Sequence, residues 1–266
     1  RRDGPNVDGF PQHRAKRAMS ARRWRRPSWF AIALTVAGIA LFMRLGIWQL
    51  DRAGEAQHLL AAFDAAPKAA FEDFAAVRSA PPTDRYPHVR LRGRFLADRG
   101  WLRDEQVRDG KLGVEAYAAF AAEGGDAPNG NGEVLLVDRG WITWSHERGT
   151  QPLLPALSEG DVELAGVYAP FPGNGIRVGG NALARQSTWP KLTLAIDAQE
   201  IAADLERPLL PRVLLLDADT ASGFARSWTP SVMPPERHRA YAVQWFAFAV
   251  AAIVIFVLLH FRKIQK

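Results

Sequence analysis

The chain has 266 residues and a formal net charge of +6, but its basic residues cluster near the two ends. Residues 1–50 and 262–266 hold thirteen Lys and Arg, which leaves residues 51–261 with 21 basic and 26 acidic side chains. This acidic balance argues against nucleic acid as a partner. The absence of cysteine excludes thiolate copper transfer, c-type haem attachment and disulfide exchange.

Two apolar segments are each long enough to cross a bilayer. Residues 29–50 are apolar except for Thr35, Arg44 and Gln49, and residues 240–261 carry no Asp, Glu, Lys or Arg. A helix of 22 residues spans the hydrocarbon core of about 30 Å. We therefore predict transmembrane helices at 27–50 and 240–261, with one folded domain at 51–239 between them.

The first segment could instead be a cleaved signal peptide, because basic residues precede it. Its length and the lack of a small-x-small cleavage site before Asp51 favour an uncleaved anchor. Basic residues flank both segments on the sides that face the chain ends, and such flanks stay cytoplasmic. We therefore expect a protein of the bacterial inner membrane with a disordered basic cytoplasmic tail at 1–26, a short cytoplasmic tail at 262–266, and a periplasmic domain between the two helices.

The central block shows the patterns of an α+β domain with mainly antiparallel strands. The first helix should continue over residues 53–63. Residues 86–96 alternate apolar and basic side chains, so we expect a strand whose arginines and His88 face solvent. Asp109-Gly110 is a favoured hairpin turn. The predicted elements are strands at 101–107, 112–120, 134–137, 161–168 and 213–216, a bent edge at 189–193, a helix capped by Asp197 that ends at Leu205, and loops at 78–84, 122–132 and 170–181.

Catalytic motifs are missing from the sequence. The six histidines have no metal-ligand spacing, and there is no G-x-S-x-G elbow, P-loop or dinucleotide fingerprint. We therefore expect no enzyme activity.

His238 is the strongest candidate for a ligand. Tyr241, Gln244, Trp245 and Phe248 follow it at helical offsets, so one face combines an imidazole with flat aromatic and amide groups. This face would suit an amphipathic macrocycle with a metal centre, since imidazole is a common axial ligand. The alternative is that His238 is only an interfacial anchor.

Arg44, Trp48 and Gln49 lie near the outer end of the first apolar segment. Arg44 either extends to the outer interface or pairs with Gln244 inside the two helices. Trp48-Gln49 and Gln244-Trp245 lie at matching depths, so we expect two amides and two indoles to converge there.

Three motifs together resemble the surfeit locus protein 1 family. They are Leu45-Gly46-Ile47-Trp48-Gln49 with Arg52, Val137-Asp138-Arg139-Gly140-Trp141-Ile142, and His238 with Tyr241-Ala242 and Gln244-Trp245-Phe246. The resemblance covers nearly the whole chain from Arg44. It departs from the family at Ala56, where a Lys is usual, and at Asp138, where Asn is common.

The resemblance implies an assembly factor for an aa3-type cytochrome c oxidase that helps to insert haem a into subunit I. It implies subunit I, other oxidase assembly proteins, haem A synthase and membrane lipid as partners. His238 would be the haem ligand, with Trp48, Gln49, Tyr241, Gln244 and Trp245 along the haem face, and Arg44 or Arg52 would pair with a propionate. Two alternatives remain: a cofactor-free scaffold that docks oxidase subunits, and an unrelated outward-facing sensor or ligand-binding domain.

Overall fold

The computed structural model describes residues 22–24, 26–79, 85–124, 132–145, 152–173, 183–230 and 232–263. Residues 1–21 of the predicted tail, and much of the predicted loops at 78–84, 122–132 and 170–181, lie outside these ranges. The chain forms two compact units. One combines Arg1–Ala53 with Pro235–Lys266, and the other is Gly54–Pro234.

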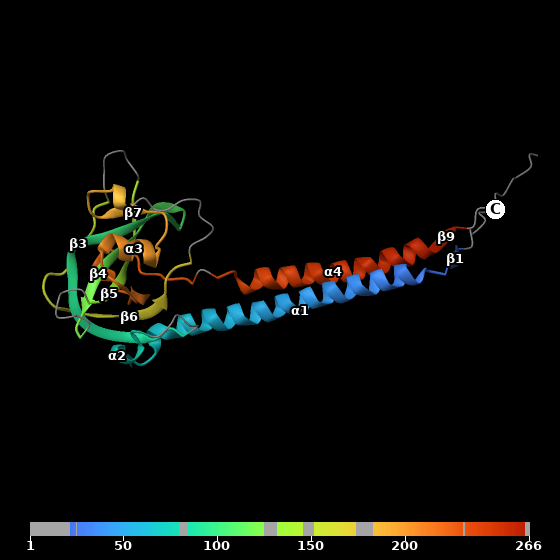
Figure 1. Cartoon of the computed structure of the whole chain (residues 1–266), viewed down its shortest axis with the longest axis horizontal. Coiled ribbons are helices and arrows are strands. Elements are labelled where there is room, and N and C mark those ends of the chain that lie inside the picture. The colour runs from blue at the N-terminus through green and yellow to red at the C-terminus, as the bar shows by residue number, and fades with distance from the viewer. Residues whose placement is uncertain are drawn as a thin grey trace, which may run out of the picture. The chain divides into compact units, whose positions relative to one another are not determined.

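The first unit is built on two long helices, α1 (Trp29–Ala65) and α4 (Pro235–His260) (Figure 1). Both are long and apolar enough to cross a membrane, by length and composition. Ser28 begins α1, because its Oγ accepts a hydrogen bond from the N–H of Ala31 at 3.2 Å. The helix continues beyond residue 50, as its Ala- and Leu-rich sequence predicts, and a 3₁₀ turn follows at Ala66–Lys68.

Small residues let α1 and α4 pack closely. A Cβ on Gly46 would lie 2.3 Å from Cε1 of Phe246, so only glycine allows this approach. Ala242 and Ala249, seven residues apart on α4, are almost fully buried. On the other helix, Phe42 stacks on Trp245 with ring centroids 6.0 Å apart. Close packing at small residues is typical of paired membrane helices.

The chain ends next to these helices also pair. Strand β1 (Arg22–Trp24) runs antiparallel to β9 (Phe261–Lys263). The ring of Trp24 lies 5.0 Å from that of Phe261. Part of each predicted tail therefore forms a strand, which differs from the disorder expected for residues 1–26.

The second unit is a β-rich domain with a seven-stranded mixed sheet. Its strands are β2 (Glu72–Asp73), β3 (His88–Arg108), β4 (Lys111–Ala122), β5 (Val134–Thr143), β6 (Val162–Pro170), β7 (Lys191–Thr193) and β8 (Leu209–Leu216). The prediction of mainly antiparallel pairing is correct in part. Three pairings are parallel: β2 with β3, β3 with β7, and β5 with β8.

Strand β3 closes the sheet into a barrel. Its first residues, 88–93, pair with β6, and residues 93–108 pair with β4 (Figure 1). The ring β3-β4-β5-β8-β6 is thereby complete. The sequence predicted two separate strands here, but one 21-residue strand with register shifts forms instead. Closure removes the unpaired edges that an open sheet would leave on these five strands.

Buried side chains cover both faces of this barrel. One cluster includes Val89, Phe120, Leu135, Tyr168 and Leu214, one from each of the five strands, and therefore fills the enclosed space. Alternate residues of β5 face a second cluster, which lies under the helix α3 (Ala198–Leu205). This explains the unbroken apolar run at 134–137, because a strand buried on both faces does not alternate.

Local signals set the turns. Asp109 and Gly110 both have positive φ, 49° and 73°, in the hairpin between β3 and β4. The side chain of Asp197 caps α3 by accepting hydrogen bonds from the backbone of Gln199 and Glu200. Short helical turns complete the domain at Phe74–Val77 (α2), Leu183–Arg185 and Thr220–Ser222.

The prediction that His88 is a surface residue is wrong. Its residue surface is 5% exposed, whereas Arg90, Arg92 and Arg94 of the same row are exposed as predicted. Nδ1 of His88 lies 2.9 Å from the carbonyl oxygen of Ala69, and Nε2 lies 2.9 Å from Oδ2 of Asp217. Both partners are acceptors, so the ring makes both hydrogen bonds only when each nitrogen carries a proton. His88 therefore joins the segment after α1 to the segment after β8.

We predict that His88→Ala lowers the stability of the domain by about 2–3 kcal/mol, because it leaves Asp217 without its buried partner. The melting temperature of the full chain in detergent, followed by tryptophan fluorescence, should fall by roughly 5–10 °C. The control is His58→Ala, since His58 is exposed on α1. Equal melting temperatures for the two variants would contradict this role of His88.

Candidate functional site

The helix pair brings two of the predicted site residues into contact. Nδ1 of His238 on α4 lies 2.8 Å from Oε1 of Gln49 on α1. The amide oxygen can only accept, so Nδ1 donates, and in the neutral ring the other nitrogen, Nε2, keeps its lone pair. Metal-binding histidines commonly have this arrangement, in which an oxygen acceptor orients the ring through the nitrogen that is not the ligand.

Aromatic and basic groups lie along the same two helices. Trp245 is half-buried and packs against Phe42 and Phe248, with ring centroids 6.0 Å and 5.8 Å away. Trp48 is 48% exposed, and the guanidinium carbon of Arg52 lies 5.8 Å from its ring centroid. The flat surface that the sequence suggested is thus present in part.

The other predicted residues lie outside the contact between the helices. Tyr241 and Gln244 are exposed on α4, and Arg44 is exposed on α1. The predicted convergence of two amides is therefore incomplete, because only Gln49 enters the helix contact. Arg44 and Gln244 also lie outside the contact between the two helices. The exposed position of Arg44 is compatible with the alternative in which its side chain extends along the helix surface to the outer interface.

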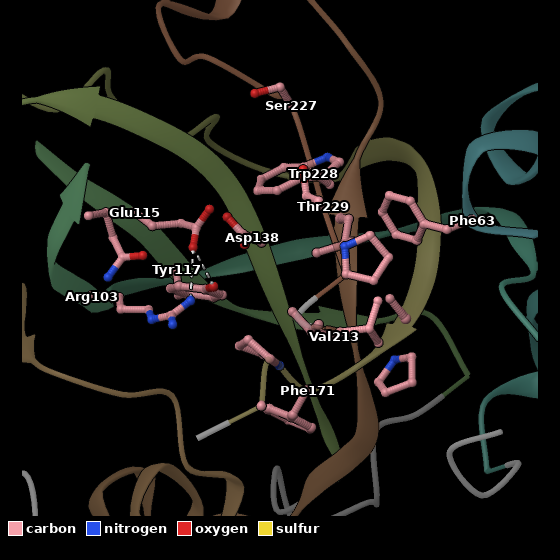
Figure 2. A pocket seen from close by; sticks show the side chains of 18 of the residues that line it. Phe63, Arg103, Glu115, Tyr117, Asp138, Phe171, Val213, Ser227, Trp228 and Thr229 are labelled. Carbon is pink, nitrogen blue, oxygen red and sulfur yellow. Dashed lines mark hydrogen bonds and ion pairs between the residues drawn. The ribbon is translucent and has the colours of Figure 1, made fainter. Parts of the chain in front are cut away.

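A second site, which the sequence did not reveal, lies in the β-rich domain. A cavity of about 810 Å³ has Glu115, Tyr117 and Asp138 along one wall (Figure 2). The hydroxyl of Tyr117 donates to Oε2 of Glu115 at 3.1 Å. Arg108 contacts Oε1 of Glu115 at 2.6 Å, and Arg103 contacts Oε2 at 3.5 Å. The charge of Glu115 is thus neutralised by two arginines.

A β-bulge creates this wall. Tyr117 pairs with Asp138 and Ala116 pairs with Gly140, so Arg139 is an extra residue in β5. Asp138 and Trp141 are three residues apart and would face opposite sides of a regular strand. The bulge puts Asp138 beside Tyr117 and Trp141 beside Glu115, on one face of the sheet. The motif Asp138-Arg139-Gly140-Trp141 is therefore the sequence of a bulge.

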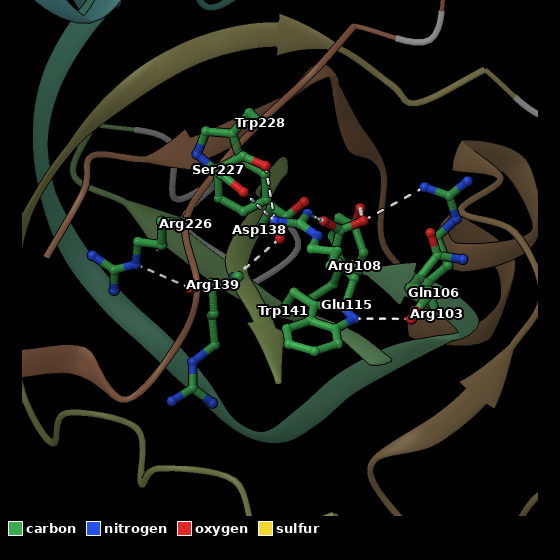
Figure 3. A network of polar contacts seen from close by, with 12 residues as sticks. Arg103, Gln106, Arg108, Glu115, Asp138, Arg139, Trp141, Arg226, Ser227 and Trp228 are labelled. Carbon is green, nitrogen blue, oxygen red and sulfur yellow. Dashed lines mark hydrogen bonds and ion pairs between the residues drawn. The ribbon is translucent and has the colours of Figure 1, made fainter. Parts of the chain in front are cut away.

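The other motif residues anchor this bulge (Figure 3). Trp141 is 9% exposed, and its indole N–H donates to the carbonyl of Gln106 at 3.0 Å. Arg139 donates to the carbonyl of Pro155 at 2.6 Å. Burial, together with the nearby charge of Arg226, lowers the pKa of Arg139 to about 10. Trp141 belongs to the core, and the side chains of Arg139 and Trp141 both have structural partners.

Burial controls the charge of the wall. Asp138 is 1% exposed, and burial together with the charge of Glu115 raises its pKa well above the ordinary value. Burial and Asp138 likewise raise the pKa of Tyr117. Glu115 has two arginines in direct contact and Asp138 has neither, so Asp138 is the member of the pair whose neutral form is favoured.

Metal-ligand clusters are absent from the described residues: no group of three or more His, Cys, Asp or Glu side chains could hold an ion there. The candidate sites are therefore the His238–Gln49 contact on the helices and the Glu115–Tyr117–Asp138 wall in the domain. The sequence motifs predicted the first of these two sites, on the helices.

Comparison with known proteins shows the family of the chain. A family model described as the SURF1 family matches residues 36–250, which include most of both helices and the whole domain. The chain belongs to the SURF1 family. This confirms the resemblance seen in the sequence.

Two SURF1-like proteins are similar to the chain. One, from Rickettsia conorii, is 24% identical over 225 residues, which is 82% of this chain and 86% of the relative. Another, from Rickettsia felis, is 24% identical over 224 residues, or 82% of this chain and 91% of the relative. The similarity thus extends over nearly the full length of these SURF1-like proteins.

The grouping of Glu115, Tyr117 and Asp138 in one wall could not be predicted from the sequence, for a physical reason. Glu115 and Tyr117 alternate along β4 as any half-exposed pair would, and the bulge beside them is visible only from strand pairing. The one available signal was Asp138 itself, an acidic residue directly after the apolar run at 134–137. A charged residue at the end of a buried strand suggests a buried polar site.

We predict that Asp138→Asn makes the domain more stable than the wild type as pH rises. The native state holds the Asp138 proton more tightly than the unfolded chain does, so wild-type stability falls with pH above about 4. Asparagine does not titrate, so the free energy of unfolding of the variant should exceed that of the wild type by a margin that grows by up to about 1.4 kcal/mol per pH unit. Unfolding midpoints of both forms across pH measure the difference. Asp109→Asn, at an exposed site, should show no such trend, and a pH-independent gap for Asp138→Asn would contradict the assignment.

We also predict that Gly140→Ala destabilises the domain by about 2–4 kcal/mol. Gly140 has φ of 122°, and a Cβ there would lie 2.7 Å from Cβ of Phe224. The matched variant is Gly110→Ala, where φ is 73° but no atom lies within 4 Å, so it carries only the conformational cost of about 1–2 kcal/mol. Chemical unfolding compares the two, and an equal loss would show that the contact with Phe224 is unimportant.

Proposed function

We propose that the chain is a membrane-anchored assembly factor for an aa3-type haem–copper cytochrome c oxidase, and that it assists insertion of haem a into subunit I. Membership of the SURF1 family supports oxidase assembly. The lengths and apolar character of α1 and α4 support anchoring in a bacterial inner membrane. The basic flanks support cytoplasmic termini and a periplasmic domain.

The hydrogen bond between Gln49 and His238 carries the haem part of the proposal. Gln49 holds the proton of the imidazole on Nδ1, so Nε2 is the nitrogen with a free lone pair. Neutral imidazole in this state is the usual nitrogen ligand of haem iron. His238 would thus hold the haem, and Gln49 would act as a positioning residue through the ring.

The remaining residues fit a haem face in part. Trp245 and Trp48 offer aromatic surfaces, and Arg52 offers a cation beside Trp48 for a propionate. When bound, haem a would supply an iron centre that accepts a nitrogen ligand. Tyr241, Gln244 and Arg44, which are exposed, would touch it only from the outer surfaces of the helices.

The partners follow from the same proposal. Subunit I of the oxidase would receive the haem, haem A synthase would supply it, and other assembly proteins would meet the complex. Membrane lipid would surround the exposed apolar side chains of α1 and α4. We propose no enzymatic step for the chain.

A cofactor-free scaffold is the second candidate, and one observation favours it. Gln244 and Tyr241 are polar groups exposed on an apolar helix. Amides within a membrane span are usually satisfied by a neighbouring helix. A membrane helix of an oxidase subunit could provide that contact. Variants at Arg139 or Trp141 would not test docking, because both side chains stabilise the domain itself.

We predict that His238→Ala abolishes binding of haem a by the purified full chain, measured from its visible spectrum, and lowers haem a occupancy of the oxidase in cells. Gln49→Leu should weaken haem binding by about 10–100-fold, because the ring loses its orienting acceptor. His260→Ala is the control, since His260 lies at the opposite end of α4 and bonds to the carbonyl of Phe256.

The same experiment separates the two candidates. If the chain carries haem, His238→Ala removes the haem spectrum and lowers the haem a content of the oxidase. If the chain is only a scaffold, Gln244→Leu reduces copurification of the oxidase, while His238→Ala changes neither copurification nor oxidase haem content.

A further inference from the structure

The cavity in the domain is mostly apolar beyond its polar wall. Phe63 of α1, Phe171, Val213 and Trp228 lie around it, while Glu115 and Asp138 lie together at one side (Figure 2). Its volume of about 810 Å³ is in the range of small-molecule sites, which are largely apolar with a few convergent polar groups. This lining suits a molecule that has both an apolar part and a polar head.

The charges of the lining residues balance. Arg103 and Arg108 are opposed by Glu115 and by the exposed Asp109, and burial raises the pKa of Asp138 and so favours its neutral form. A carboxylate head would lie beside the charge of Glu115, and an ammonium head would lie beside two guanidinium groups. Both arrangements cost free energy in a buried site. The wall therefore offers hydrogen bonds rather than net charge.

We propose that this cavity binds an uncharged amphipathic molecule, whose hydrocarbon body lies against Phe63, Phe171 and Val213 and whose hydroxyl or carbonyl head lies at Asp138. This site is separate from the helix residues proposed to hold haem. It does not depend on the function proposed above.

The polar wall has free capacity for such a head. One oxygen of Asp138 accepts from the N–H of Gly140 at 3.1 Å, and its side chain also hydrogen-bonds to Tyr117. A neutral carboxyl group has more hydrogen-bonding positions than these two contacts use, so Asp138 can still bond a hydroxyl or carbonyl head. The raised pKa of Asp138 agrees with a neutral head.

The test uses three photoreactive probes with the same chain and different heads: dodecanol, dodecanoic acid and dodecylamine, each with a diazirine in the chain. The full chain is reconstituted in phosphatidylcholine nanodiscs, labelled by light, and mapped by mass spectrometry. Labels on α4, which contributes no residue to the cavity lining, report how much probe enters the bilayer. The readout is labelling of peptides that contain Phe171, Val213 or Trp228, divided by labelling of α4.

We expect the dodecanol probe to label these peptides at least about fivefold more than either charged probe, which corresponds to about 1 kcal/mol. Thr229→Trp, at an exposed position of the cavity lining, should remove the label by filling the space. Leu194→Trp, exposed and outside the lining, should not. Stronger labelling by a charged probe, labels confined to the helices, or equal labelling of the Thr229→Trp variant would each overturn the proposal.

The head contact has its own readout. In the wild type, labelling by dodecanol should fall in alkaline buffer, when Asp138 loses its proton. Asp138→Asn keeps a neutral group that donates and accepts, so its labelling should stay constant with pH. Labelling that falls equally in both proteins would overturn the assignment of Asp138 as the contact for the head.

Discussion

The hydrogen bond between Gln49 and His238 depends on how closely α1 and α4 approach each other. Gly46 leaves room for the ring of Phe246, and Ala242 and Ala249 leave room along the other helix. A larger side chain at any of these positions would push the helices apart and lengthen the 2.8 Å contact. The motif glycine, the amide and the imidazole thus form one physical unit, in which packing fixes the geometry and the amide fixes the tautomer.

The β-rich domain depends in the same way on two irregular features. The length of β3 lets one strand pair with both β6 and β4 and so close the barrel. The bulge at Arg139 turns Asp138 and Trp141 to one face, where Trp141 supports the hairpin and Asp138 joins Glu115 and Tyr117. Irregular strand positions thus create both the stability of the barrel and the polar wall of its cavity.

Much of this architecture could be predicted from sequence because its signals are local. Apolar length predicted the helices, alternation predicted the exposed arginines of β3, and Asp109-Gly110 and Asp197 predicted a turn and a cap. Long-range features could not be predicted. His88 was misplaced because its partner Asp217 is 129 residues away. Gln244 was expected inside the helix pair because depth along a helix can be counted, whereas the rotation of a helix about its axis is set by packing.

The most direct test of the central claim is the protonation state of His238, measured by ¹⁵N NMR on the full chain with labelled histidine and assigned by loss of its signals in His238→Gln. We expect a proton on Nδ1, an unprotonated Nε2, and a change in the Nε2 signal when haem a is added. A proton on Nε2, or an Nε2 signal that does not respond to haem a, would contradict this claim.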